Sequence, residues 1–140
     1  MTDAIGGTRS VLLPDGWLAP RGYVNGLVAD GRLLVLAGQI GWDPCTGRIV
    51  SDGFADQVRQ ALENVLALLH EESVGAEQLV RLTWYVTDRA AYLATRREVG
   101  EFWRERFGPS YPPMSVVVVS GLIEPRALVE IEATAVLARS

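Results

Sequence analysis

The residues best suited to chemistry are two glutamates near the C-terminal end of the chain, in the stretch LVEIEATAVL. Glu130 and Glu132 are separated by one residue, and in a β-strand this spacing points both side chains to the same face, roughly 7 Å apart. Two carboxylates on one face can move protons to and from a substrate or water, which is the work of a general base or acid. The alternative interpretation is a solvated strand face without a catalytic role.

Other residue types that commonly bind metals or carry catalysis are scarce. The chain has one cysteine, Cys45, and one histidine, His70. These are too few for an intrachain disulfide or a multi-thiolate metal site, and fewer than most zinc sites need. The glycines of GWDPCTG lack the spacing of a phosphate-binding loop. We therefore expect no metal site and no nucleotide-binding loop.

The overall charge bears on the class of partner. The formal net charge is −4 and the pI is about 5.0, so no excess of positive charge attracts nucleic acid or anionic lipid. The N-terminal stretch MTDAIGGTRS lacks a basic and then apolar secretion signal, and no apolar run is long enough to span a bilayer. We expect a cytoplasmic protein that binds neither nucleic acid nor membrane.

The elements that must position the glutamates begin with two apolar-rich runs around Asp30 and Gly31. An Asp-Gly pair between such runs favours a tight turn, which predicts a β-hairpin over residues 23–40. A turn-rich loop over residues 41–47 then ends the second strand. A further strand around Ser10 to Leu13 is a weaker possibility.

Two helices follow, with a strand between them. Apolar residues recur every three or four positions from Phe54, which predicts a helix with Asp52 as its N-cap and Gly75 as its terminator. The stretch LVRLTWYVTD alternates apolar and polar residues, as a half-buried strand does. Asp88 then caps a second helix, which ends near Phe107 because Gly108 and Pro109 cannot continue it.

The resulting order of strands and helices predicts an α+β fold in which the helices cover one face of a sheet. Residues 1–140 fit a single domain, since a hydrophobic fraction of 49% supplies a core at this length. In the run YPPMSVVVVS, the residues at odd and at even positions are both mostly apolar, so both faces of that strand should be covered. Two helices cannot cover both faces, which indicates a subunit interface at the valine strand.

Four segments contain, in order, the motifs GQI, DPCTG, QALEN and VEIEA. Together these segments resemble the reactive intermediate imine deaminase family, known as RidA or endoribonuclease L-PSP-like proteins. The resemblance runs from about Tyr23 to the end of the chain. It implies a chorismate-mutase-like sandwich with a mixed β-sheet and two helices on one face. It also implies a homotrimer with a central barrel and small-molecule pockets at the subunit interfaces, without any cofactor.

The resemblance also implies site residues. Glu130 matches the glutamate that positions the attacking water, which leaves Glu132 as a structural neighbour, and Tyr23 matches a tyrosine that lines the pocket. Family members that hydrolyse imines carry Pro-Ala-Arg-Ser, with an arginine that holds the substrate carboxylate. This chain has Met114 at the arginine position, followed by Ser115.

Two further pocket positions are apolar where family members often have polar residues. Ala37 replaces the serine that precedes Gly38 and Gln39, and Val116 stands where cysteine or threonine is common. Efficient hydrolysis of small 2-imino acids is therefore not expected, unless another arginine reaches the pocket from a neighbouring subunit.

Three functions remain open from the sequence. The first is a trimer that binds, and hydrolyses with Glu130, an imine or enamine more apolar than those formed from small amino acids. The second is a non-catalytic small-molecule-binding or regulatory homologue, which the changes at Ala37, Met114 and Val116 favour. The third is an endoribonuclease, against which the acidic charge and the lack of clustered His and Lys residues argue.

Overall fold

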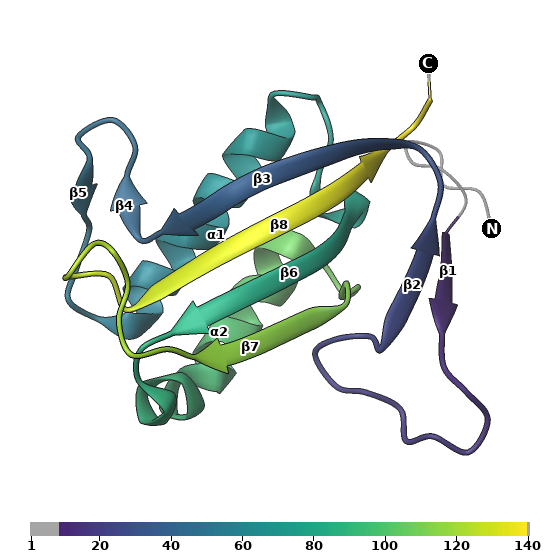
Figure 1. Ribbon diagram of the computed structural model, residues 1–140, viewed down its shortest axis with the longest axis horizontal. Helices are drawn as coiled ribbons and strands as arrows, with labels where there is room; N and C mark the ends of the chain where they lie inside the picture. Colours follow the sequence, from purple (N-terminus) through teal and green to yellow (C-terminus); the bar gives the residue numbers. More distant parts are fainter. Residues whose placement is uncertain (1–8, 140) are drawn as a thin grey trace.

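The protein combines a four-stranded sheet with two helices and two small two-stranded sheets, as a computed structural model of residues 9–139 shows (Figure 1). The elements in chain order are β1 (Arg9–Leu12), β2 (Gly26–Ala29), β3 (Arg32–Ile40), β4 (Trp42–Asp43), β5 (Arg48–Ile49), α1 (Phe54–His70), the 3₁₀ turn η1 (Ala76–Gln78), β6 (Leu79–Val86), α2 (Arg89–Phe107), β7 (Met114–Val118) and β8 (Val129–Leu137). No helix of the described residues is long and apolar enough to cross a membrane.

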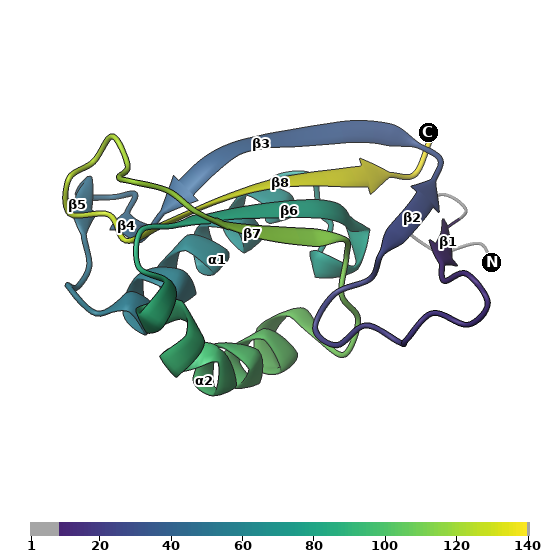
Figure 2. The ribbon, with the colours of Figure 1, turned by 60° about the horizontal axis from the view of Figure 1, so that its bottom comes forward.

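The large sheet is mixed, with the strand order β3-β8-β6-β7. The C-terminal strand β8 is antiparallel to both of its neighbours, β3 and β6, whereas β6 and β7 are parallel and joined through α2. Both helices lie against the same face, and no helix within residues 9–139 covers the other (Figure 2). This confirms the predicted α+β fold, and we call the uncovered side the open face.

The core lies between the sheet and α1. Five residues of α1 at helical spacing have no exposed surface: Val58, Ala61, Leu62, Val65 and Leu69. They meet the buried residues of β6 and β8, which alternate along each strand as the sequence predicts. Burial of these apolar side chains holds the sheet in place, at about 1.5–3 kcal/mol for each large one.

The hairpin predicted over residues 23–40 is wrong. Strand β2 pairs with β1, and β3 pairs with β8 on both sides of a register shift between Leu36 and Gln39, so β2 and β3 do not pair with each other. At Gly31 the φ angle is +148°, and a Cβ there would collide with the carbonyl oxygen of Leu137. The Asp-Gly pair therefore marks a bend where the chain passes from one sheet to the other (Figure 1). The hairpin in this region is β4–β5, which begins within the predicted turn-rich loop of residues 41–47 and ends just beyond it.

The predicted limits of α2 are confirmed. The Asp88 carboxylate accepts a hydrogen bond from the backbone N–H of Ala91 at 3.1 Å, as an N-cap does. The helix ends at Phe107, and Gly108 follows with a φ angle of +93° that favours glycine.

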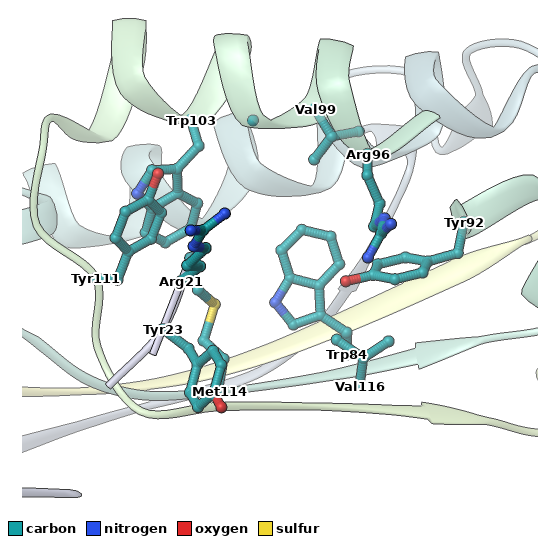
Figure 3. A pocket seen from close by; sticks show the side chains of 12 residues that line it. Arg21, Tyr23, Trp84, Tyr92, Arg96, Val99, Trp103, Tyr111, Met114 and Val116 are labelled. Atoms are coloured by element: carbon teal, nitrogen blue, oxygen red, sulfur yellow. The ribbon is translucent and has the colours of Figure 1, made fainter. Parts of the chain in front are cut away.

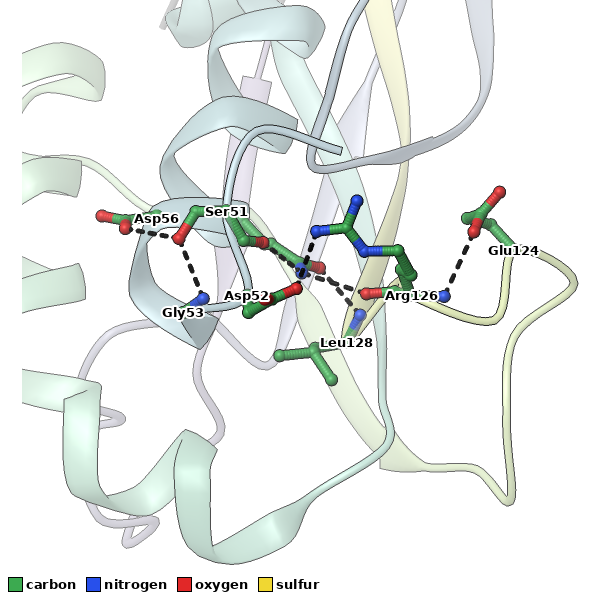
Figure 4. Close-up of polar contacts among 8 residues, drawn as sticks. Ser51, Asp52, Gly53, Asp56, Glu124, Arg126 and Leu128 are labelled. Carbon is green, nitrogen blue, oxygen red and sulfur yellow. Dashed lines mark hydrogen bonds and ion pairs between the residues drawn. The ribbon is translucent and has the colours of Figure 1, made fainter. Parts of the chain in front are cut away.

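The predicted caps of α1 are wrong. Its N-cap is Gly53, whose N–H donates to the Ser51 hydroxyl at 2.9 Å, while Asp52 forms an ion pair with Arg126 at 2.7 Å (Figure 4). The helix ends at His70, before Gly75. Spacing in the sequence cannot show that Asp52 has a distant arginine as its partner.

Gln57 joins α1 to the loop that leads into β8. Its side chain is fully buried, and its amide N–H donates to the backbone carbonyls of Ser51 at 2.8 Å and Arg126 at 3.1 Å. Its amide oxygen accepts a hydrogen bond from the N–H of Leu128 at 2.8 Å. Gln57 therefore fixes the backbone at Leu128, immediately before β8 and two residues before Glu130.

Candidate functional site

Glu130 and Glu132 lie on the open face, with different partners. The sheet register places Tyr85 beside Glu130 and Thr83 beside Glu132. The Tyr85 hydroxyl donates a hydrogen bond to Glu132 Oε1 at 2.7 Å, which raises the pKa of Tyr85 because the bond stabilises the protonated phenol. Glu130 forms no side-chain hydrogen bond or ion pair with any residue the structure describes. Of the two carboxylates, Glu130 is therefore the one free to act on a bound molecule.

Gly38 makes room for the Glu130 carboxylate. A Cβ at position 38 would lie 2.5 Å from Glu130 Oε2 and 2.8 Å from its Cγ and Cδ. The β3–β8 pairing shifts register here, between Leu36 and Gln39, and the neighbouring Ala37 is exposed. Ala37, Gly38 and Glu130 thus share one region of the sheet, as the resemblance implies for site residues.

Three other predicted site residues line a cavity on the opposite side of the sheet. Tyr23, Met114 and Val116 contribute to a cavity of about 360 Å³ between α2 and the sheet (Figure 3). We call it the α2 cavity. Its remaining described lining residues are Arg21, Gly22, Trp84, Tyr92, Arg96, Val99, Gly100, Trp103 and Tyr111. A cavity of this size, mostly apolar with a few polar groups, is typical of a small-molecule site.

Aromatic side chains form the walls of the α2 cavity. The rings of Trp103 and Tyr111 stack with centroids 5.5 Å apart, and those of Trp84 and Tyr92 meet edge to face at 6.4 Å. Trp103 Nε1 donates to the Ser110 carbonyl at 3.2 Å, so its position is fixed by a hydrogen bond. These contacts give the cavity flat, rigid surfaces.

The predicted site residues are divided between the two faces of the sheet. Met114 pairs with Leu82, whose side chain is buried on the helix side, so Met114 faces the helices. Ser115 pairs with Thr83, which pairs with Glu132, so these three side chains share the open face. One chain therefore does not bring Glu130 and Met114 together. A second cavity of about 230 Å³ lies near the start of β7, and Tyr23, Met114 and Ser115 all line it.

Two arginines that line the α2 cavity were not among the residues predicted for the site. On α2, Arg97 forms a helix-surface ion pair with Glu101 at 3.5 Å. Arg96 and Arg21 instead line the cavity, and neither pairs with a carboxylate among the described residues. A signal for Arg96 was present: Tyr92, Arg96, Val99 and Trp103 follow one another at spacings of four, three and four, which places them on one helix face.

No cluster of three or more His, Cys, Asp or Glu side chains among residues 9–139 is arranged to hold a metal ion. The chemistry available in the described part of the chain is that of a free carboxylate on one face and of guanidinium, phenol and indole groups on the other.

Comparison with known proteins defines the family. The family model described as Endoribonuclease L-PSP matches residues 17–137. The chain belongs to this family. A RutC family protein from Pyrococcus horikoshii is 34% identical over 91% of this chain and 97% of its own length. The human 2-iminobutanoate/2-iminopropanoate deaminase is 29% identical over 81% of this chain and 79% of its own length.

A solved structure supports the same conclusion. The crystal structure of the Rid family protein YyfB from Yersinia pestis, whose function is unknown, matches with a TM-score of 0.79 and 30% identity. The match covers 92% of this chain and 98% of that one. Family and fold both agree with the resemblance seen in the sequence.

Proposed function

We propose that this protein hydrolyses a small imine or enamine, with Glu130 as the group that orients and deprotonates the attacking water. The observation that carries this proposal is the unpaired Glu130 carboxylate, held beside Gly38 on an open sheet face while Glu132 is bound to Tyr85. The names of the human and goat relatives, 2-iminobutanoate/2-iminopropanoate deaminase, support this class of reaction.

Imine hydrolysis needs few catalytic groups from the protein. As the water oxygen bonds to the imine carbon, Glu130 accepts a proton from the water and passes it to the imine nitrogen, which takes the C=N electron pair, so that a carbinolamine forms. Glu130 then accepts the hydroxyl proton of the carbinolamine and donates it to nitrogen as the C–N bond breaks, so that ammonia and the carbonyl product leave. The reaction consumes one water per imine, and one carboxylate serves first as base and then as acid.

The complete site, in this proposal, is shared between two copies of the chain. Glu130 lies on the open face and Met114 on the helix side, so a ligand in contact with both requires Glu130 from one copy and the α2 cavity from another. The open face that a second copy would cover carries exposed apolar side chains: Leu33 is 68% exposed, Val35 66% and Val117 41%. The homotrimer that the resemblance implies would provide such contacts, and patches of this kind mark protein interfaces.

The test is an imine hydrolysis assay. Imines are formed in situ from alanine and from larger apolar amino acids, and release of ammonia is measured above the spontaneous rate. Glu130→Gln should lower kcat by about a hundredfold or more, the usual effect of losing a general base. Glu132→Gln, on the same strand face, should stay near the wild-type rate. Equal rates for wild type and Glu130→Gln would remove Glu130 from catalysis.

A second candidate function is binding without turnover. Ala37, Met114 and Val116 are apolar at positions where the resemblance implies polar groups, and this favours a binding or regulatory role. The same assay separates the two candidates: a ligand that binds tightly and leaves unchanged, with no imine hydrolysed, would support the binding role.

A further inference from the structure

We propose that the α2 cavity binds a carboxylate that carries an aromatic ring, with Arg96 and Arg21 holding the carboxylate and the indole N–H of Trp84 as an additional donor. If the proposed function holds, the substrate would be an imine formed from an aromatic amino acid, and only this consequence rests on the proposed function. The binding itself is independent of any reaction.

The polar groups of the cavity are nearly all donors. Arg21 and Arg96 present two guanidinium groups that pair with no carboxylate among the described residues, and no Asp or Glu lines the cavity within this part of the chain. Guanidinium groups bind carboxylates well because two parallel N–H groups match the two oxygens. Both arginines are exposed, which places them at the rim, where they can meet an anion entering from water.

Trp84 supplies an independent observation that points to a ligand in the α2 cavity. Its side chain is only 4% exposed, and its Nε1 is buried without a hydrogen-bond partner among the described residues. Buried N–H groups in proteins nearly always have an acceptor. In Figure 3 the indole lies in the middle of the lining side chains, between Arg96 and Met114, so an acceptor oxygen of a ligand in the cavity would fill this need.

The aromatic part of the ligand follows from the walls. The stacked pair Trp103–Tyr111 and the edge-to-face pair Trp84–Tyr92 offer flat surfaces suited to another ring. Met114 adds a flexible apolar contact where an arginine would have filled the space with charge. A volume of about 360 Å³ accommodates a phenyl ring together with a short acid chain.

The experiment is a calorimetric titration with phenylpyruvate, the stable oxo acid that corresponds to the imine of phenylalanine. Two comparison compounds test the two halves of the recognition: pyruvate lacks the ring, and phenylacetone lacks the carboxylate. We expect phenylpyruvate to bind more tightly than either. Arg96→Gln should weaken its binding by about tenfold to a hundredfold, as expected for the loss of a charge-assisted hydrogen bond.

The matched control is Arg97→Gln, which removes the neighbouring guanidinium on the outer side of α2 and should leave binding unchanged. Both positions are exposed, so both variants should keep the wild-type fold by circular dichroism. Failure of the wild type to bind phenylpyruvate, or equal affinity in wild type and Arg96→Gln, would overturn the proposal. Phenylpyruvate binding without hydrolysis of any imine would uphold it and reject the proposed function.

Discussion

Gly38 is the residue that most directly controls the position of the Glu130 carboxylate. The glycine hydrogen leaves Glu130 Oε2 without a clash, whereas a Cβ at this position would lie 2.5 Å from that oxygen. Glu130 is a flexible side chain, so an added methyl group would move its carboxylate and leave the backbone in place.

We therefore predict that Gly38→Ala keeps the fold and loses activity. A carboxylate displaced by about 1 Å can lower the rate by about a hundredfold, because proton transfer depends on the distance to the water. The measurement is kcat for imine hydrolysis. Gly121→Ala is the control, since a Cβ at that position meets no atom within 4 Å. Wild-type kcat in Gly38→Ala would contradict the role given to Glu130.

At the residue scale, the sequence predicts which side chains share a face but not which of them are paired. Strand alternation places Glu130 and Glu132 together, and the structure confirms this. The hydrogen bond from Tyr85 to Glu132 joins residues 47 positions apart, so the pairing depends on the register of β6 against β8. No local pattern contains that register, and Glu130 was favoured over Glu132 only through the family resemblance.

At the element scale, the connection between α1 and β8 holds the site in place. Gln57 forms hydrogen bonds with the backbone carbonyls of Ser51 and Arg126 and with the backbone N–H of Leu128. The Asp52–Arg126 ion pair joins the same two segments. The Gln57 side chain is fully buried, so its three hydrogen bonds contribute more than those of an exposed side chain.

Gln57→Leu should lower the free energy of unfolding by at least about 2 kcal/mol, because the substitution leaves buried backbone groups without partners. Chemical denaturation measures this difference. Gln60→Leu is the matched control: Gln60 is in the same helix, half-buried, and its amide N–H donates to Asn64 at 2.9 Å. We expect a smaller loss there. An equal loss in both variants would mean that Gln57 has no special role.

Helices and their strands were easier to predict than the turns between them. The periodicity of α1 and the caps of α2 depend on nearby residues, so the sequence contains the information. The Asp-Gly pair at residues 30–31 satisfies the local rule for a hairpin, yet pairing of β3 with β8 provides more hydrogen bonds and a buried face. Tertiary pairing overrides the local preference at this point.

At the scale of the whole molecule, the residues of the proposed site are divided between the two faces of the sheet. Glu130 lies on the open face, and the α2 cavity lies on the helix side. The subunit interface expected at the valine run remains a proposal for the exposed valines of β7 and the exposed apolar residues of β3. The number of chains in the assembly stays a prediction, since it depends on contacts between copies.

A complementation measurement tests the shared site most directly. Glu130→Gln removes the carboxylate on the open face, and Met114→Trp fills the α2 cavity on the helix side. Each variant alone should be nearly inactive in imine hydrolysis. When the two are coexpressed at equal levels, random assembly places intact Glu130 opposite an intact cavity in about a quarter of the shared sites, so about a quarter of wild-type activity should return. Activity of the mixture no higher than the sum of the separate variants would contradict a site built from two copies.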